Sequence, residues 1–301
     1  MSKVMTMQEA VARFVRDGDL VVMEGFTHLI PFAAGHEIIR QKKKNLTLAR
    51  LTPDLIYDQL IAAGCARRMI FSWAGNPGVG PLHAFRRAVE QGQPQPLEIE
   101  EYTHFGMVLR LSAGAANLPF LPTRNYPGTD LTKVNPAFKT IRSPYTDEDL
   151  WCVPALRPDV TVVHAQRADA EGNTQVWGLY GVQKEAAFAS ARVIVSVEEV
   201  VDSSVIRSDP NRTILPGTIV SAVVPEPFGA HPSFVQGAYD RDNDFYVKWD
   251  AISRDAAGLR AYLDEWVYGL PGRSAYIKKM GERYEGLKAD RQMCAPVNYG
   301  F

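Results

Sequence analysis

The sequence has few cysteines: Cys65, Cys152 and Cys294 are the only three in 301 residues. They are odd in number and far apart, and no CxxC pair occurs. Disulfide frameworks and zinc modules need closely and regularly spaced cysteines. The sequence therefore argues against both, and a reducing cytoplasm is the expected location. Cys65 follows a helix-ending glycine with no activating base beside it, so we expect it to be a small buried hydrophobe.

Long apolar runs are also lacking. No stretch approaches the roughly 18 residues that a membrane helix needs, and no signal-peptide pattern is present at the start. The formal net charge is −1, so no overall field attracts nucleic acid or an anionic membrane. We therefore expect neither as a partner.

Several catalytic signatures are missing as well. His36-Glu37 begins like the zinc motif HExxH, but Arg40 stands where the second histidine should be. The six histidines show no metal-binding spacing, and no GxSxG elbow occurs. The sequence thus predicts no metal site and disfavours a serine hydrolase.

What is present is a regular alternation of helix and strand patterns. Thr6 and Glu9 have the spacing of a capping box at a helix start, and apolar residues then follow at helical spacing before a short apolar run at 20–23. The pattern continues with helices expected at 34–41, 52–63, 82–91, 105–116, 183–190 and 254–267, and strands at 46–51, 69–73, 118–121, 160–164, 193–197 and 219–224. It predicts an α/β fold with an open, mostly parallel sheet and helices on both faces.

Two segments break the alternation. Residues 125–156 are rich in Pro, Thr, Asp and Lys with little periodicity, and a loop of that length is usually functional or part of an interface. The tail at 289–301 is weakly patterned and is expected to be mobile or bound to a partner. We interpret 1–301 as one domain with a loop-rich excursion.

Two loops that follow predicted strands are candidate binding sites. In parallel sheets, ligands bind outside the carboxyl ends of the strands. The first loop is 24–28, where Gly25 lets the backbone approach a ligand closely. The second is 75–80, with three glycines in six residues before a predicted helix, which suits an anion or coenzyme A. An ordinary strand-to-helix turn is the alternative for each. The candidate residues are Gly25, Phe26, Thr27 and His28, with Asn76, Gly78, Val79 and Gly80.

A third candidate is His104, preceded by the carboxylates Glu100 and Glu101. The two carboxylates are expected in the first turn of a helix, where they complement its dipole. His104 is expected to donate a hydrogen bond to a substrate carboxylate or carbonyl.

Several motifs together resemble a known family. They are MSKVMT at 1–6, Asp17-Gly18 before an apolar strand, GFT at 25–27, LPFLP at 118–122, HAQxADxxGNxxxWG at 164–178 and GAHPS at 229–233. In this order they resemble the A (alpha) subunits of family I CoA-transferases, in the glutaconate CoA-transferase branch. The segments EGFTHLIP at 24–31, TPDLIYD at 52–58 and NPGVG at 76–80 are similar to members acting on 3-oxoadipate. Glu24 stands where the general signature has glycine, and bears on substrate choice.

The resemblance implies a CoA-transferase fold of the NagB/RpiA-like class and a division of labour between two kinds of subunit. In this family a glutamate of the B subunit attacks the donor acyl-CoA, giving an acyl-glutamyl anhydride and then an enzyme–CoA thioester. Its SxGENG-like context is absent here, since Glu198-Glu199 lacks the glycines. The resemblance therefore implies no catalytic residue in this chain, no permanently bound cofactor, coenzyme A as a substrate, and a hetero-oligomer with the B subunit, A2B2 or larger.

By the same resemblance this chain forms a wall of the shared site. Backbone donors of 25–28 would face the anionic intermediates, and the 76–80 loop and His104 would contact substrate or coenzyme A. Arg124 would bind the distal carboxylate of a dicarboxylic acid. Three alternatives stay open: a glutaconate-specific A subunit, a ring-opening CoA-thioester hydrolase whose acidic base stands near the 104 position, and a non-catalytic binding or regulatory protein on this fold.

Overall fold

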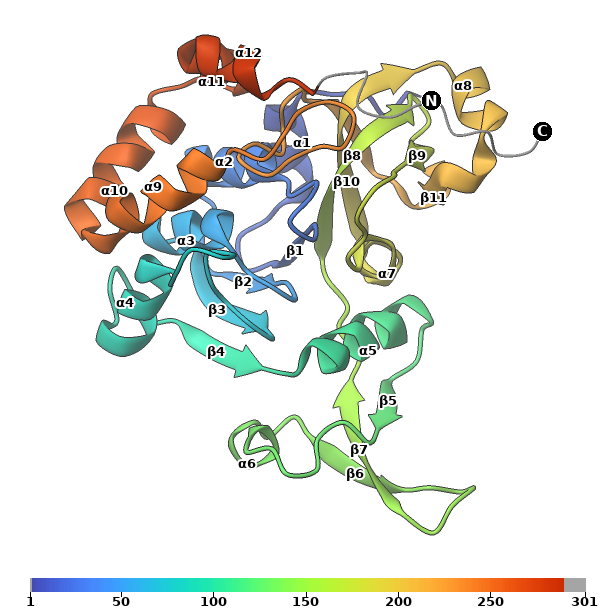
Figure 1. The fold of residues 1–301 in the computed structure, drawn as a ribbon. Helices are drawn as coiled ribbons and strands as arrows, with labels where there is room; N and C mark the ends of the chain where they lie inside the picture. The colour runs from blue at the N-terminus through green and yellow to red at the C-terminus, as the bar shows by residue number, and fades with distance from the viewer. Residues whose placement is uncertain (1, 290–301) are drawn as a thin grey trace.

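The fold is built on seven parallel strands in the order β12-β10-β8-β1-β2-β3-β4 (Figure 1). It was obtained as a computed structural model, which describes residues 2–289. Two short antiparallel strands extend the sheet beside β8. The bounds are β1 Leu20–Glu24, β2 Leu46–Ala49, β3 Ala66–Phe71, β4 Glu98–Glu101, β8 Val160–Asp169, β9 Thr174–Gln175, β10 Arg192–Val201, β11 Thr213–Leu215 and β12 Ala222–Pro225. The predicted mostly parallel sheet is confirmed.

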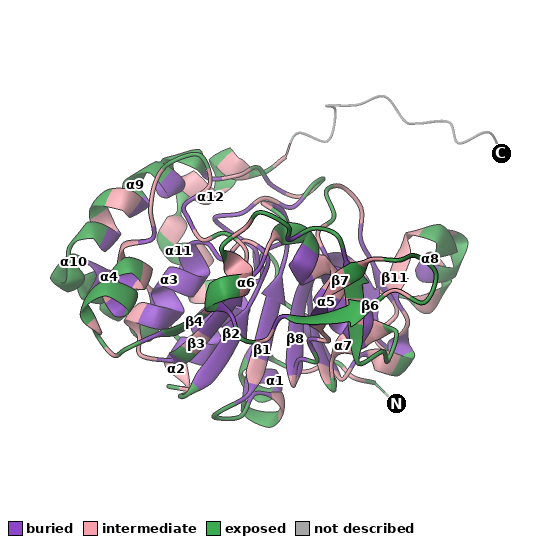
Figure 2. Ribbon diagram, turned by 90° about the horizontal axis from the view of Figure 1, so that it is seen from below, coloured by how far each residue is buried: buried purple, intermediate pink, exposed green. Residues whose placement is uncertain are grey.

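Helices cover both faces of this sheet, as strand β1 shows. Val21 and Met23 point to the core beneath α1 to α4, whereas Val22 packs with α5 and α7 on the other face. The central strands are accordingly buried along their length (Figure 2). This is expected because successive side chains of a strand point to opposite faces of the sheet, and helices cover both faces. The bounds are α1 Met7–Phe14, α2 Phe32–Arg40, α3 Leu55–Ala62, α4 His83–Gln91, α5 His104–Ala115 and α7 Gln183–Ala189.

The C-terminal part adds an outer helical layer. Helices α9 and α10 pack on α4 and α3, with Trp249 fully buried between them and the core. The remaining elements are α6 Leu131–Val134, α8 Ser203–Ser208, α9 Asn243–Arg254, α10 Ala256–Leu263, a π-turn at Asp264–Tyr268, α11 Arg273–Met280, α12 Glu282–Leu287, and the 3₁₀ turns Pro210–Arg212 and Gly217–Ile219.

Local sequence signals fixed some helix ends and not others. The capping box at α1 is confirmed: Glu9 N–H donates to Thr6 Oγ1 at 3.2 Å and Thr6 N–H donates to Glu9 Oε2 at 2.8 Å. The helix expected at 52–63 starts later than predicted, because α3 begins at Leu55 after Asp54. The helix expected at 254–267 is present as α10 and the π-helix that continues it to Tyr268, but it starts two residues later, after the Asp255 cap, and the sequence missed α9 before it.

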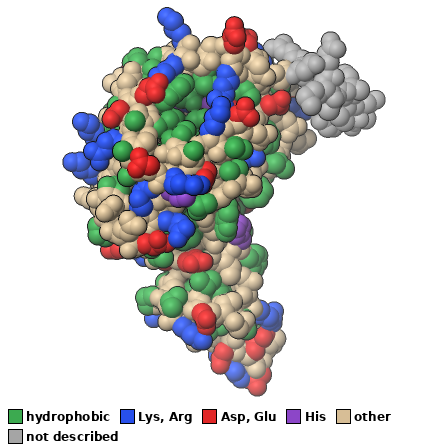
Figure 3. Space-filling model, turned by 60° about the vertical axis from the view of Figure 1, so that its left-hand side comes forward, with side chains coloured by type: hydrophobic (Ala, Val, Ile, Leu, Met, Phe, Trp, Pro, Cys, Tyr) green, Lys and Arg blue, Asp and Glu red, His purple; other side chains and the backbone are tan. Residues whose placement is uncertain are grey.

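Residues 118–154 form a small sheet of their own, of order β5-β7-β6, which projects from the body (Figure 1). Its strands are β5 Phe120–Thr123, β6 Lys139–Arg142 and β7 Asp149–Pro154. The strand expected at 118–121 thus belongs to this antiparallel sheet and not to the main one. Charged side chains of both signs are interspersed on this projecting lobe (Figure 3). The sequence missed β6 because all four of its residues are exposed and show no apolar alternation.

The described part of the chain shows neither a membrane-spanning helix nor a metal-binding cluster of side chains. Across residues 2–289, no helix has the length and apolar character needed to cross a membrane. The same residues hold no group of three or more His, Cys, Asp or Glu side chains arranged to bind a metal ion. The tail expected to be mobile or partner-bound lies, beyond Ala289, outside the described residues.

Candidate functional site

Several candidate residues lie at one edge of the main sheet, where its parallel strands end. The 24–28 loop follows β1, Arg50 follows β2, Ser72 and the 75–80 loop follow β3, and His104 follows β4. Because β1, β2, β3 and β4 are adjacent in that order, and neighbouring strands lie about 4.8 Å apart, these segments meet along one rim.

The 24–28 loop is strained and firmly held. Thr27 and Leu29 both adopt positive φ, 56° and 58°, which costs about 1–3 kcal/mol for each non-glycine residue and persists only where the surroundings enforce it. The fully buried His28 supplies much of this restraint. Its Nδ1 lies 3.2 Å from Leu179 O, and its Nε2 accepts from the N–H of Gln236 at 2.9 Å. His28 thus fixes the loop from behind and does not itself face the rim.

The restrained loop presents free backbone donors. Among residues 2–289, the N–H groups of Phe26 and Thr27 have no protein hydrogen-bond acceptor. The side chain of Phe26 is 41% exposed. Successive free N–H groups in a turn of this kind form a concavity suited to an anion. Fixed donors like these can stabilise charge that develops on an oxygen atom.

Arg50 lies beneath this loop. Its side chain is 1% exposed, it donates a hydrogen bond to Gly25 O, and its Nη1 lies 3.0 Å from Asp54 Oδ1. The carbonyl that accepts from Arg50 belongs to the same peptide unit as the N–H of Phe26. A guanidinium on the carbonyl oxygen polarises that unit and makes its N–H a stronger donor. The sequence analysis did not identify Arg50, although a charged residue within the apolar run 46–51 was a usable signal.

Glu24 is the second buried charged group behind the loop. Burial raises the pKa of its carboxyl to about 7, against the lowering effects of Arg50 and of the N–H groups of Gly25 and Leu51. Its Oε2 is buried without a hydrogen-bond partner among the described residues. An alanine methyl group built at Gly181 would lie 2.9 Å from Glu24 Oε1. Glu24 therefore fills a closely packed space, and the raised pKa of its carboxyl lies close to neutral pH.

Replacing Glu24 by glutamine is expected to stabilise the chain increasingly as pH rises from 5 to 8. Between the ordinary pKa of 4.5 and the folded value of about 7, the native state binds more protons than the unfolded state. Stability of the unmodified chain therefore falls across that window and is level above it. The gain should grow by about 2–3 kcal/mol, measured by urea unfolding at each pH. The exposed Glu98→Gln serves as control, and a pH-independent difference would contradict the buried-carboxyl interpretation.

His104 begins helix α5 and faces the end of β3. The preceding Thr103 caps the helix, because its Oγ1 accepts from Gly106 N–H at 3.0 Å. The Nδ1 of His104 lies 3.0 Å from Ser72 Oγ, and the residue is exposed. Ser72 was not identified from the sequence, and a serine after a strand carried no distinguishing signal there.

The two carboxylates before His104 do not occupy a helical first turn, so that expectation is wrong. They end strand β4, and the helix starts only at His104. Glu100 Oε1 accepts from Arg110 Nη1 at 2.8 Å and from the Tyr102 hydroxyl at 2.6 Å. Glu100 also pairs with Arg68, so its contacts join β4 to β3 and α5.

The 75–80 loop leans toward helix α9. The fully buried Asn76 donates from Nδ2 to Tyr246 O at 2.7 Å, and the N–H groups of Val79 and Gly80 donate to Asn76 O. Gly78 has a φ of 76° that favours glycine. The N–H groups of Val79 and Gly80, which the sequence analysis expected to bind an anion, therefore form hydrogen bonds within the turn. Val79 is 38% exposed.

Arg124 directly follows strand β5 of the small sheet. Its guanidinium makes two contacts with Glu148, the one from Nε to Oε2 at 3.1 Å. The contact lowers the pKa of Glu148 to about 2. The Arg124 side chain is 71% exposed. The next residue, Asn125, donates from Nδ2 to Thr103 Oγ1 at 2.5 Å, so the end of β5 lies beside the start of α5, while the Arg124 side chain itself pairs with Glu148.

A Ser–His–Glu arrangement occurs at 164–198, but it is buried. His164 Nδ1 lies 2.9 Å from Ser196 Oγ, and its Nε2 lies 2.7 Å from Glu198 Oε1. Ser196 is 1% exposed within β10, so no substrate reaches its hydroxyl. Glu198 also accepts from Phe228 N–H and the Tyr239 hydroxyl. The network holds the segment at 226–239 against the strands and is structural.

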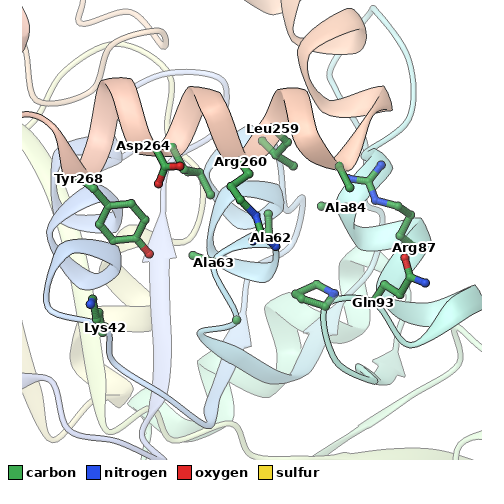
Figure 4. A pocket seen from close by; sticks show the side chains of 14 residues that line it. Lys42, Ala62, Ala63, Ala84, Arg87, Gln93, Leu259, Arg260, Asp264 and Tyr268 are labelled. Carbon is green, nitrogen blue, oxygen red and sulfur yellow. The ribbon is translucent and has the colours of Figure 1, made fainter.

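A cavity of about 830 Å³ lies near the opposite ends of the strands, away from the rim (Figure 4). Its lining comes from α4, from α10, and from the segments where α2, α3 and α4 end, and it includes Lys42, Arg87 and Arg260. These segments lead into the amino ends of β2, β3 and β4. The cavity is therefore remote from the rim that carries the free backbone donors.

Comparisons with known proteins identify a family. A family model described as Coenzyme A transferase matches residues 4–226. The chain is 54% identical over 282 residues to the A subunit of 3-oxoadipate CoA-transferase from Pseudomonas knackmussii, covering 94% of this chain and 99% of that one. It is 35% identical to the A subunit of glutaconate CoA-transferase from Acidaminococcus fermentans, covering 93% and 92%. The crystal structure of glutaconate coenzyme A-transferase from that organism matches with a TM-score of 0.92 at 34% identity, covering 96% of each chain.

Proposed function

The chain belongs to the coenzyme A transferase family, and from this premise we propose that it is the A subunit of an enzyme that moves CoA from an acyl-CoA donor such as succinyl-CoA to 3-oxoadipate. The observation that carries the proposal is the similarity along nearly the whole chain to the A subunit of a 3-oxoadipate CoA-transferase. Coenzyme A is then a substrate and not a resident cofactor. Family relatives named as A subunits support a partner B subunit, and we propose an A2B2 or larger assembly in the cytoplasm.

The geometry suits a subunit that stabilises charge without supplying the nucleophile. A carboxylate of the partner would attack the acyl carbon, and negative charge would develop on the acyl oxygen. The N–H groups of Phe26 and Thr27 would receive that oxygen, in a loop fixed in advance by His28. Donors already in position cost no reorganisation during the reaction. Arg50 would strengthen the Phe26 donor from behind without touching substrate.

Contacts to the rest of the substrates are proposed for the neighbouring segments. The exposed Val79 and the turn at Gly78 and Gly80 would meet coenzyme A, with Asn76 holding that turn through its bond to Tyr246 O. His104 would contact the acyl group from the start of α5. Arg124 would meet the distal carboxylate only by exchanging its pairing with Glu148, so Arg124→Ala should raise the KM for the acid if it has this role.

The proposal is tested by making the chain with and without its B subunit. The purified chain alone should transfer no CoA, and the co-expressed pair should transfer CoA from succinyl-CoA to 3-oxoadipate. Activity of the isolated chain would overturn the two-subunit proposal. A panel with glutaconate and other dicarboxylic acids identifies the acceptor. If the complex instead opens a ring in the acyl group of a CoA thioester, the hydrolase alternative is identified.

A further inference from the structure

The Ser72 hydroxyl proton has a determined position. Ser72 Oγ lies 2.5 Å from Leu51 O, and two oxygen atoms approach so closely only when a proton lies between them. The carbonyl oxygen has no proton to give, so the hydroxyl donates to it. Leu51 O also accepts from the N–H groups of Ser72 and Trp73, at 3.1 and 3.2 Å. The single hydroxyl proton of Ser72 is therefore committed to Leu51.

That commitment fixes the tautomer of His104. Ser72 Oγ, 3.0 Å from His104 Nδ1, can only accept, so Nδ1 must carry the ring proton. In the neutral ring Nε2 then bears a lone pair. Within residues 2–289, Nε2 has no hydrogen-bond partner, and His104 is exposed at the rim. The sequence analysis expected His104 to donate to a carboxylate or carbonyl, whereas the neutral ring offers an acceptor.

The acceptor lies close to the proposed site for the acyl oxygen. Strands β1 and β3 flank β2, so their ends are about 10 Å apart. Through Ser72, the His104 ring is tied to Leu51 at the end of β2. The N–H of Leu51 in turn faces the carboxyl of Glu24 at the end of β1. The ring is thus tied to the 24–28 loop across two strand spacings, about 10 Å.

We propose that His104, held by Ser72 as the Nδ1–H tautomer, accepts a proton at Nε2 from carbon 2 of a 3-oxoacyl group, and that the assembled enzyme therefore exchanges the hydrogens of that carbon with solvent. The inference rests on the proposed function for its substrate. Carbon 2 lies between two carbonyl groups. When its C–H bond breaks, the electron pair spreads over both carbonyl oxygens and an N–H bond forms at Nε2. Return of a solvent-derived proton from Nε2 restores the acyl group, so no co-reactant is needed.

In this scheme Ser72 is a positioning residue, and its role is tested by measuring the tautomer of His104. The complex is prepared with ¹⁵N-histidine in this chain only, and His104 is assigned by its loss in His104→Asn. In the neutral ring we expect a protonated Nδ1 and an unprotonated Nε2. In Ser72→Ala the ring should shift toward the Nε2–H form, and Ser72→Thr, which keeps a hydroxyl, should restore it. An Nε2–H ring in the unmodified complex overturns the inference.

The exchange activity is measured with 3-oxoadipyl-CoA in D₂O. Incorporation of deuterium at carbon 2 is followed by mass spectrometry at short times. The quantity measured is the incorporation with the enzyme minus the incorporation in buffer alone, called the increment below. His104→Asn removes the Nε2 atom, while its amide can still donate to Ser72, and should lower the increment at least tenfold. Ser72→Ala should lower it several-fold, and Ser72→Thr should recover it. Each variant is first shown to copurify with the B subunit and to melt as the unmodified complex does.

The outcomes separate this inference from the proposed function. If the complex transfers CoA to 3-oxoadipate but shows no exchange increment, or if His104→Asn exchanges undiminished, only the inference fails. If the complex transfers no CoA to 3-oxoadipate, the proposed function fails, and the tautomer measurement still decides whether Ser72 holds His104 as stated.

Discussion

Replacement of Gly25 by alanine should lower the kcat of CoA transfer about a hundredfold. A methyl group at this position would lie 2.7 Å from both His28 O and Leu29 O, and 2.8 Å from Leu29 C. All three are backbone atoms, so no side chain can turn aside to make room. The loop must shift, and the N–H groups of Phe26 and Thr27 shift with it. Such overpacking also costs about 1–3 kcal/mol of stability.

The loss should fall mainly on kcat, because these donors act on charge present only in the transition state. The complex with the B subunit is assayed for kcat and KM, and its melting is followed to show that it remains folded at the assay temperature. Gly286→Ala is the matched control, since a methyl group there meets no atom within 4 Å. A folded Gly25→Ala complex with an unaltered kcat would remove this loop from the oxyanion role.

Replacement of Arg50 by methionine should destabilise the chain by about 3–5 kcal/mol. The change leaves Gly25 O without its donor and Asp54 buried without its cation. Burial already raises the pKa of Asp54 although Arg50 opposes it, so the lone carboxylate is costly to ionise. Urea unfolding of the chain measures the loss.

Two controls test this explanation. Arg86 and Glu90 form an ion pair of the same i,i+4 spacing at 3.0 Å, but their side chains are 57% and 52% exposed. Arg86→Met should therefore change stability by no more than about 0.5 kcal/mol. Adding Asp54→Asn to Arg50→Met should recover part of the loss, because no charge then remains buried. Equal effects of the buried and exposed substitutions would contradict the role given to burial.

The buried position of Arg50 also bears on how this site tolerates substitution. Glu24, Arg50 and Asp54 together fill the space beneath the 24–28 loop, and Glu24 Oε2 has no hydrogen-bond partner among residues 2–289. A change in one of the three alters both the packing and the charge behind the backbone donors. Substitutions here should therefore couple, and the combination of Glu24→Gln with Arg50→Met should depart from additivity in urea unfolding.

Local patterns were informative where a short segment decides its own conformation. The Thr6–Glu9 capping box and the apolar strands of the main sheet were predicted from neighbouring residues, and the structure confirms them. The family was predicted from motifs spread along the chain, and the match over residues 4–226 confirms it. The start of α3 was misjudged because Asp54, the residue before it, pairs with Arg50 four residues earlier and does not bond as a side-chain cap.

By itself the sequence determined the parallel α/β architecture, the family, and the set of loops that follow the strands, because these depend on periodicity and on motifs contained in single segments. Only the tertiary structure decided which members of that set share a rim. It turned His28 inward, occupied the N–H groups of Val79 and Gly80, and placed Arg124 against Glu148. It also set Arg50 behind Gly25 and Ser72 against His104. The contacts of Arg50 and of Ser72 join residues that follow different strands, and the order of the strands in the sheet determines them.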